Sequence, residues 1–249
     1  MIGLLFLVKD SIPHLKKWMD WMRTSPNRVG IAAIHPWAGH FESPDMLDDL
    51  VIPTVPTSWE QTLPALRALA FAGERVWFMN EAGGRERPTH LMYVSESCVP
   101  IQGTSPDDLV AIAQRHPDKT ILSRMGGTNK ARIITGRTVD WTVFPHEWRN
   151  HRLGVQHEQW VMLNRNHIAA YKDDAVAAAF SRCFADNEHY PYYAVRHMFG
   201  ESALAFENIT YTDWRLGGPH PKTFKRGLPD DVAKQARAKG FVLARKVTR

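Results

Sequence analysis

The chain contains little cysteine and lacks a long hydrophobic run. Its 249 residues include two cysteines, Cys98 and Cys183, which lie far apart in the sequence. Two distant cysteines exclude a disulfide framework and a cysteine-based metal site. The opening segment, Met1–Lys9, is apolar but too short for a membrane anchor, and no basic residues begin it as in a secretory signal. We therefore expect a cytoplasmic protein with no membrane span.

Several common cofactor motifs are missing as well. The glycines at positions 126–127 lack the spacing of a phosphate-binding P-loop, and no Gly-x-Gly-x-x-Gly follows the first expected strand. His151, His157 and His167 are not spaced as metal ligands on one helical turn. These absences argue against a P-loop enzyme, a dinucleotide-binding enzyme and a zinc site.

The composition is that of an ordinary globular protein, 44% hydrophobic and 23% charged. Lysine and arginine number 31 against 26 aspartates and glutamates, which gives a net charge of +5. This excess suits a diphosphate or a nucleic-acid backbone, but no nucleic-acid-binding motif is present, so we expect no nucleic-acid partner. Nine tryptophans indicate either a large aromatic core or flat apolar faces for binding sugars.

The beginning of the chain has the pattern of a strand–helix–strand unit. Gly3–Val8 and Val29–Ile34 are continuous apolar runs, as expected of strands buried on both faces. Between them, apolar residues at 15, 18, 19 and 22 follow the period of an amphipathic helix. The unit predicts a sheet that starts parallel.

Further elements follow at intervals typical of one α/β domain spanning residues 1–249. A capping box, Ser58 with Gln61, predicts the start of a helix that continues to about Ala72. The region Gly126–Leu153 is of mixed polarity and predicts loops and short strands. The other expected helices are Pro106–Arg115, Asn166–Phe184, Glu188–His197 and Asp230–Lys239, and the other expected strands are His90–Val94, Thr120–Ser123, Ile209–Tyr211 and Phe241–Ala244.

The segment Thr210–Phe224 is the most informative part of the chain. It combines a strand-like start, a tryptophan, a Gly-Gly pair and a Pro-His-Pro sequence. Glycine allows unusual backbone dihedrals and proline fixes its own φ, so the segment predicts a rigid, shaped loop. Binding sites are often built on such loops.

This segment closely resembles the T-Y-x-D-W-x-x-G-G-P-H-P-x-x-F signature of the Core-2/I-branching glycosyltransferase superfamily. That superfamily includes branching β-1,6-N-acetylglucosaminyltransferases, peptide O-xylosyltransferases and plant-type relatives. Other segments resemble its motifs in the same order along the chain. They are the opening unit with His35 after its second strand, Ser58-Trp59, His90–Ile101 (L-x-x-L-S-E-S-C-x-P-L), Glu158-Gln159-Trp160 with Arg165 (G-S-Q-W-x-x-L-x-R), Asp186–Tyr190 (D-E-H-Y) and Phe241–Lys246 (F-x-x-A-R-K).

The resemblance implies a GT-A glycosyltransferase fold, with a Rossmann-like mixed sheet flanked by helices. It also implies inverting transfer of a sugar from a UDP-sugar to an acceptor hydroxyl on a glycan or glycoconjugate. Xylose, N-acetylglucosamine and glucuronate are the donor sugars within the superfamily. A compact chain without the stem of the Golgi-anchored relatives suggests a microbial or viral source.

The same resemblance assigns roles to single residues. Glu188 falls on the glutamate of D-E-H-Y and is the expected catalytic base. Asn187 replaces the usual aspartate, which leaves Asp186 as a substitute carboxylate. Read by position alone, Glu188 could instead be a helix N-terminal glutamate stabilised by the helix dipole.

We expect basic residues, and no metal or cofactor, to compensate the charge on the departing UDP. Lys246 falls on the closing lysine of the family, while Lys222 follows the Pro-His-Pro sequence and Arg245 is a reserve. The motif around Glu96 offers one carboxylate where metal-dependent relatives have two, and Cys98 stands where some relatives have aspartate. Each lysine could equally be an ordinary solvated side chain.

The remaining candidates surround the two substrates. We expect Val8 and His35 near the nucleotide, and Glu96, Trp160 and Trp214 near the donor or acceptor sugar. A core or second-layer position is the plain alternative for each of them. At the level of the whole protein, the alternatives are a non-catalytic glycan-binding module that retains the fold, and a basic nucleic-acid-binding protein.

Overall fold

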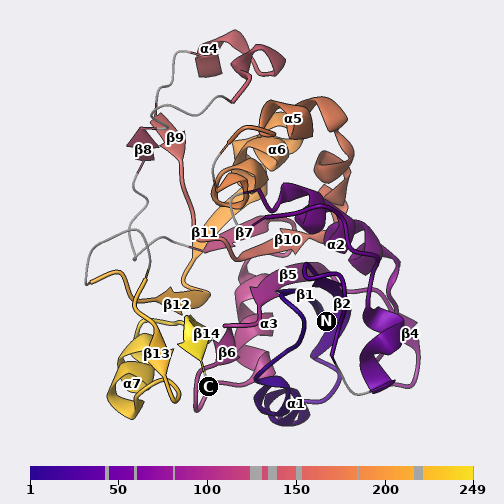
Figure 1. Cartoon of the computed structure of the whole chain (residues 1–249), viewed down its shortest axis with the longest axis vertical. Helices are drawn as coiled ribbons and strands as arrows, with labels where there is room; N and C mark the ends of the chain where they lie inside the picture. The colour runs from indigo at the N-terminus through magenta and orange to yellow at the C-terminus, as the bar shows by residue number, and fades with distance from the viewer. Residues whose placement is uncertain are drawn as a thin grey trace.

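The protein is a mixed α/β structure built on a six-stranded sheet, as seen in a computed structural model (Figure 1). The structure describes residues 1–42, 45–58, 61–80, 82–123, 131–133, 139–149, 153–183, 185–215 and 221–248. The sheet order is β11-β7-β10-β5-β1-β2. Neighbouring strands run parallel, except that β10 is antiparallel to both β5 and β7. The predicted mixed, mainly parallel sheet is therefore confirmed.

The elements alternate along the chain as the sequence patterns indicate. The helices are α1 (Leu15–Arg23), α2 (Leu63–Arg75), α3 (Pro106–Arg115), α4 (His146–Arg149), α5 (Asp174–Ala179), α6 (Tyr190–Phe199) and α7 (Asp230–Ala238), with 3₁₀ turns η1 (Asp45–Leu50), η3 (Trp141–Val143), η4 (Arg165–Lys172), η5 (Asp186–Glu188) and η6 (Glu201–Ala203). The strands are β1 (Ile2–Val8), β2 (Val29–Pro36), β3 (Phe78–Met79), β4 (Arg85–Glu86), β5 (His90–Ser95), β6 (Val99–Pro100), β7 (Thr120–Ser123), β8 (Ala131–Ile133), β9 (Leu153–Val155), β10 (Val161–Asn164), β11 (Leu204–Glu207), β12 (Thr210–Thr212), β13 (Phe224–Lys225), β14 (Leu243–Arg245) and β15 (Val247–Thr248).

The main core lies around the central strands β1 and β5. Every residue of β1 is buried, which matches its unbroken apolar sequence. Helix α2 packs closely on these strands because Gly73 has no side chain there. A Cβ at that position would lie 2.8 Å from Leu5 and 2.9 Å from Leu91, closer than real Cβ contacts. The close approach of α2 holds the helix, and the residues bonded to its first turn, at a fixed distance from the sheet.

A second, smaller sheet in the order β12-β14-β6 carries the end of the chain, at the lower left in Figure 1. Strands β12 and β14 are parallel, and Thr212 is aligned with Arg245. Helix α7 covers this sheet through Val232, Ala233 and Ala236, which share a hydrophobic cluster with β14 and β15. This arrangement brings the segment after β12 beside the Arg245-Lys246 pair.

The predicted capping box at Ser58 is wrong. Ser58 and Gln61 form an isolated bridge with each other, and the helix begins only at Leu63. Its first turn is capped from far along the chain, because the Asp186 carboxylate accepts hydrogen bonds from the backbone nitrogens of Thr62 (3.1 Å) and Leu63 (3.0 Å) and from the Thr62 hydroxyl (3.1 Å). A cap supplied 124 residues away leaves no local sequence signal.

The predicted helix over Asn166–Phe184 divides into η4 and α5. The Asp173 carboxylate accepts from the backbone nitrogens of Ala175 and Val176, so it starts a new helix instead of continuing the old one. Of the predicted mixed region Gly126–Leu153, the structure describes 131–133, 139–149 and 153, which include β8, η3, α4 and the start of β9. No helix in the described part of the chain is long and apolar enough to cross a membrane.

Replacing Asp186 with alanine should destabilise the protein by roughly 1–3 kcal/mol. The variant removes the cap of α2 and leaves the buried Thr62 groups without their acceptor. Urea unfolding followed by circular dichroism measures the loss. Asp118→Ala, at an exposed aspartate, is the matched control and should change stability by no more than ~0.5 kcal/mol. Equal stability of the two variants would contradict the capping role.

Candidate functional site

The candidate residues gather at one edge of the main sheet. The parallel strands β1, β2 and β5 end there with Val8, Pro36 and Ser95. Because β10 runs the opposite way, the residues that precede it, including Glu158 and Trp160, arrive at the same edge. Ligands of open α/β sheets bind outside the carboxyl ends of the strands. The sheet therefore brings Val8, His35, Glu96 and Trp160 to a place suited to ligand binding.

Glu158 lies at the centre of this edge, and the sequence interpretation gave it no role. Its side chain is 1% exposed. One carboxylate oxygen accepts from the indole nitrogen of Trp214 (2.8 Å), and the other accepts from the Thr212 hydroxyl (3.3 Å). One feature of the sequence could have drawn attention to Glu158: it departs from the resembled G-S-Q-W motif, which has a serine at this position.

Arg245 lies between Glu158 and the ring of Trp160. Its guanidinium carbon is 5.1 Å from the ring centroid, and a terminal nitrogen is 4.0 Å from the Glu158 carboxylate. The side chain is 15% exposed, and its Nε has no hydrogen-bond partner among the described residues. The guanidinium is therefore held in place by charge and stacking, and its buried Nε forms no hydrogen bond to the described residues.

Trp160 and Trp214, both sugar-binding candidates, occupy different environments. Trp160 is 1% exposed and has one ring face against Arg245. Trp214 is half-buried, with its indole nitrogen bonded to Glu158. Trp214 can therefore present a ring to a sugar, whereas Trp160 serves as a support for Arg245.

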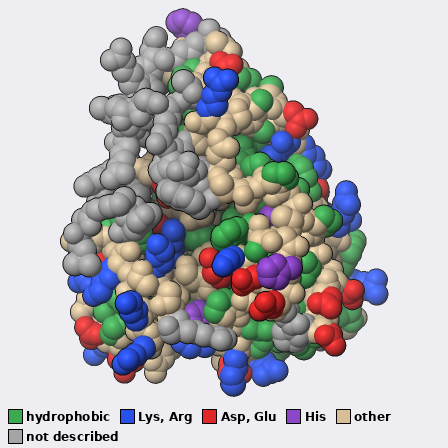
Figure 2. All heavy atoms as spheres, viewed as in Figure 1, with side chains coloured by type: hydrophobic (Ala, Val, Ile, Leu, Met, Phe, Trp, Pro, Cys, Tyr) green, Lys and Arg blue, Asp and Glu red, His purple; other side chains and the backbone are tan. Residues whose placement is uncertain are grey.

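Lys246 and Glu96 lie close enough to influence each other's charge. Burial raises the pKa of Glu96, Asp10 raises it further, and the cations Arg245 and Lys246 oppose the rise. Burial and the neighbouring Arg245 lower the pKa of Lys246, and Glu96 opposes that change. Two cations and two carboxylates thus influence one another here. Figure 2 shows that acidic and basic side chains are interspersed over the visible face of the molecule.

Glu188 is half-buried and lies next to the Glu158 segment. Its carboxylate accepts from the Gln156 side-chain amide, and its carbonyl accepts from the His157 backbone nitrogen (3.0 Å). It is near enough to Glu158 for its negative charge to raise the pKa of that group. Asp186, the substitute carboxylate, is 2% exposed, and both of its oxygens are engaged by the first turn of α2. Of these two carboxylates, Glu188 is the less buried.

Val8 and His35 are both fully buried at the ends of their strands. The Val8 carbonyl accepts from the Trp37 backbone nitrogen (2.9 Å). The His35 Nε2 accepts from the Val55 backbone nitrogen (3.0 Å), so in the neutral ring the proton lies on Nδ1. That nitrogen has no partner within the described ranges, and burial lowers the pKa of the ring, which favours the neutral form. His35 thus offers one unused donor near the sheet edge.

Lys222 is farther from these groups. Its side chain is exposed, with the amino group 5.3 Å from the Phe224 ring centroid. Its backbone nitrogen donates to the Asp213 carbonyl (2.8 Å), and Asp213 forms a bidentate pair with Arg215. The rest of the shaped loop, residues 216–220, lies outside the described residues, as do Trp59 and the 124–130 segment.

Buried polar atoms without hydrogen-bond partners are concentrated at this edge. Native interiors leave few such atoms, and a group of them indicates a place for water or a ligand. Six such atoms of the described residues lie at this edge: Gln156 Oε1, His157 Nε2, Trp160 Nε1, Thr210 Oγ1, Arg245 Nε and, at the end of β2, His35 Nδ1. Five others lie elsewhere, on Trp21, Arg87, Arg165, Tyr171 and Asn208. No group of three or more acidic, histidine or cysteine side chains placed to hold a metal occurs among the residues that the structure describes.

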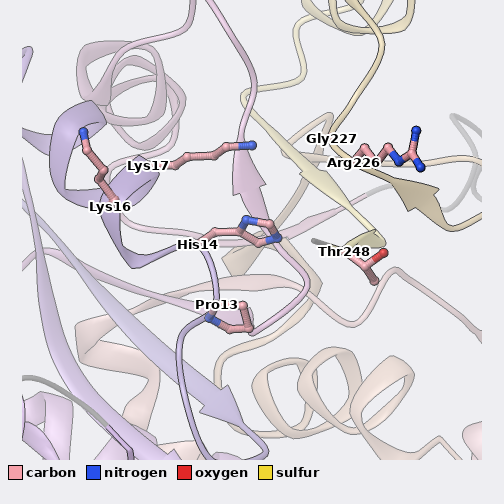
Figure 3. A pocket seen from close by; sticks show the side chains of 7 residues that line it. All are labelled: Pro13, His14, Lys16, Lys17, Arg226, Gly227 and Thr248. Atoms are coloured by element: carbon pink, nitrogen blue, oxygen red, sulfur yellow. The ribbon is translucent and has the colours of Figure 1, made fainter.

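A separate open pocket of about 350 Å³ lies between the start of α1 and β15. Its lining includes His14, Lys17, Arg226 and Thr248. His14 is hydrogen-bonded to the Val247 carbonyl (3.2 Å). Figure 3 shows the charged ends of Lys16 and Arg226 pointing away from His14 and Thr248, so the cations do not converge on one point.

No family model matches the sequence, and no curated protein matches it. Solved structures with a related arrangement include 4-diphosphocytidyl-2C-methyl-D-erythritol synthase from Anaerococcus prevotii. It is 10% identical to this chain, with a TM-score of 0.37, over 83% of this chain and 87% of that one. A TM-score of this size supports no conclusion about what the present chain does.

Proposed function

We propose that the protein is an inverting, metal-independent glycosyltransferase that moves a sugar from a UDP-sugar to an acceptor hydroxyl of a glycan or glycoconjugate. The observation that carries the proposal is that Glu158, at the carboxyl edge of the sheet, has the half-buried carboxylate Glu188 near it on one side and the cation Arg245, with Lys246 beside it in the chain, at 4.0 Å. The proposal that the donor is a UDP-sugar carrying xylose, N-acetylglucosamine or glucuronate rests on the motif resemblance.

The reaction requires a base on the acceptor side. As the acceptor oxygen attacks C1 of the donor sugar, its proton passes to the Glu188 carboxylate. The bond between C1 and the β-phosphate oxygen breaks at the same time, and the electron pair leaves with UDP. Inversion follows because the attacking and departing oxygens lie on opposite faces of C1.

The reaction also requires positive charge at the diphosphate. Arg245 has an unused donor, and Lys246 lies beside it. Two fixed cations can compensate the charge that develops on UDP, which is the contribution otherwise made by a metal ion. His35 offers its Nδ1 donor to the base of the nucleotide from the end of β2.

UDP and its sugar conjugates should raise the melting temperature of the protein in buffer that contains excess EDTA. A ligand that binds only the folded state stabilises it by about 2.7 kcal/mol when the ligand concentration is 100 times the Kd. A thermal-shift panel detects a stabilisation of this size. CDP and ADP are the matched controls, and donor hydrolysis is followed in the same samples. Dependence of binding and transfer on added manganese would contradict the metal-independent site. UDP-sugar binding with no hydrolysis or transfer would favour the glycan-binding alternative, and no nucleotide binding at all would overturn the proposal.

A further inference from the structure

The Glu158 side chain is a buried carboxylate that the proposed reaction does not use. A carboxylate that is 1% exposed loses its hydration, and such burial is costly unless partners compensate it. The resembled motif has a serine at this position, so nothing in the resemblance calls for a charge there. We propose that Glu158 is a positioning residue that fixes Trp214 and orients Arg245 toward the diphosphate; this inference rests on the proposed function.

The hydrogen bonds of Glu158 join segments that are distant in the sequence. The carboxylate binds the Trp214 indole and the Thr212 hydroxyl, 56 and 54 residues away. The backbone nitrogen of Glu158 donates to the Ser123 carbonyl (2.9 Å) at the end of β7. Its carbonyl accepts from the His157 ring (2.7 Å). The glutamate is therefore held at both its backbone and its side chain, and a fixed carboxylate in turn fixes the start of the loop that follows β12.

The contact with Arg245 is an attraction of charge and not a hydrogen bond. At 4.0 Å the two groups attract each other, but the distance exceeds that of an N–H···O bond. Trp160 supports the guanidinium from the other direction. Glu158 therefore orients Arg245 without forming a hydrogen bond to it, and in the proposed arrangement the terminal guanidinium nitrogens bind the oxygens of a diphosphate.

Opposing influences set the pKa of Glu158. Burial raises its pKa to about 7, Arg245 and the bonds from Trp214 and Thr212 oppose the rise, and the negative charge of Glu188 adds to it. Arg245 on β14 and Glu188 in η5 are the charged groups that face it, and the donors from β12 and the following turn are neutral. Above pH 7 the ionised Glu158 attracts Arg245 and holds it in place, and below pH 7 the protonated group loses this attraction, so binding of UDP at Arg245 strengthens as the pH rises.

The test is the affinity for UDP between pH 6 and pH 8.5, measured by calorimetry for wild-type protein and Glu158→Gln. Glutamine keeps an oxygen for the Trp214 bond but cannot ionise. We expect the wild-type affinity to rise by about threefold to tenfold more than that of the variant over this range, since one pKa unit corresponds to a tenfold effect. Glu147→Gln, at an exposed glutamate, removes the same charge elsewhere and should keep the wild-type profile.

Two further variants keep the inference falsifiable if Glu158→Gln does not fold. Trp214→Phe removes the indole donor that favours the ionised Glu158, so the pH at which UDP affinity rises should move upward. Arg245→Lys keeps a positive charge without the planar fork, so UDP affinity should fall at every pH. Wild-type protein that binds UDP, with a pH profile unchanged in Glu158→Gln or in Trp214→Phe, would overturn the positioning role. Wild-type protein that binds no UDP would instead overturn the proposed function.

Discussion

Glu188→Gln should reduce sugar transfer by ~10²–10⁴-fold, the usual contribution of general-base catalysis. Glutamine has the size of glutamate and can present its amide oxygen to Gln156, which now donates to Glu188. It cannot accept the proton of the acceptor hydroxyl at neutral pH. The UDP affinity and the melting temperature should stay close to wild type, because the change removes a proton acceptor and leaves the diphosphate site intact.

The appropriate control is Glu201→Gln, which alters an exposed glutamate paired with Arg196. It should retain wild-type transfer. If Glu188→Gln also transfers sugar at the wild-type rate, the base is another carboxylate. Glu96, a half-buried carboxylate near Arg245 and Lys246, would then be the next residue to test, because the oxygens of Asp186 and Glu158 already accept hydrogen bonds.

Lys246→Ala should lower transfer by at least ~100-fold, by analogy with the loss of one donor that stabilises the transition state. The Lys246 amino group is partly buried beside Arg245 and Glu96, so its loss leaves Glu96 with less positive charge nearby. UDP affinity should fall together with the rate, since the diphosphate is present before and after the reaction. Stopped assays of transfer and calorimetry of UDP binding measure the two effects separately.

Lys222→Ala should act in the same direction but less strongly, because the Lys222 side chain is exposed and lies over Phe224. Lys234→Ala removes an exposed lysine from α7 and serves as the control for the change in net charge. Near wild-type transfer in both Lys246→Ala and Lys222→Ala would place the phosphates elsewhere. If Arg245→Ala then lowered transfer and UDP affinity while the two lysine variants did not, Arg245 would be the principal cation.

The sequence predicted the buried parts of the fold well. β1, β2 and β5 are apolar on both faces, so their patterns leave little choice, and α3 and β7 have the predicted bounds. The failures come from contacts between distant residues. The start of α2 depends on Asp186, and the break before α5 depends on a side chain, Asp173, that caps a new helix instead of ending an old one.

The candidate site likewise contains residues that could be predicted from the sequence and one that could not. Arg245, Lys246, Glu96 and Glu188 could be named because short motifs contain them, and the fold brings Glu96 near Arg245 and Lys246 and brings Glu188 near Glu158. Glu158 could not be given a role, because a glutamate before an apolar strand resembles any solvated glutamate. Its importance depends on the antiparallel direction of β10 and on the alignment of Thr212 with Arg245, and neither is visible from local sequence.

The pairing of β7 with β10 has a consequence for how such a protein can diversify. The chain leaves the sheet after Ser123 and returns at Glu158. The backbone nitrogen of Glu158 donates to the Ser123 carbonyl, so the two ends of this connection are joined. Because both ends are tied to adjacent strands, changes in the length of this connection need not disturb the strands beneath it. The buried side chains of Phe144 and Trp148 and the contact of Gln156 with Glu188 must be kept, since they join the connection to the core and to the candidate base. Under the proposed function, evolution or an engineer could vary the remaining residues of the connection to change the acceptor while Arg245 and Lys246 keep the donor site.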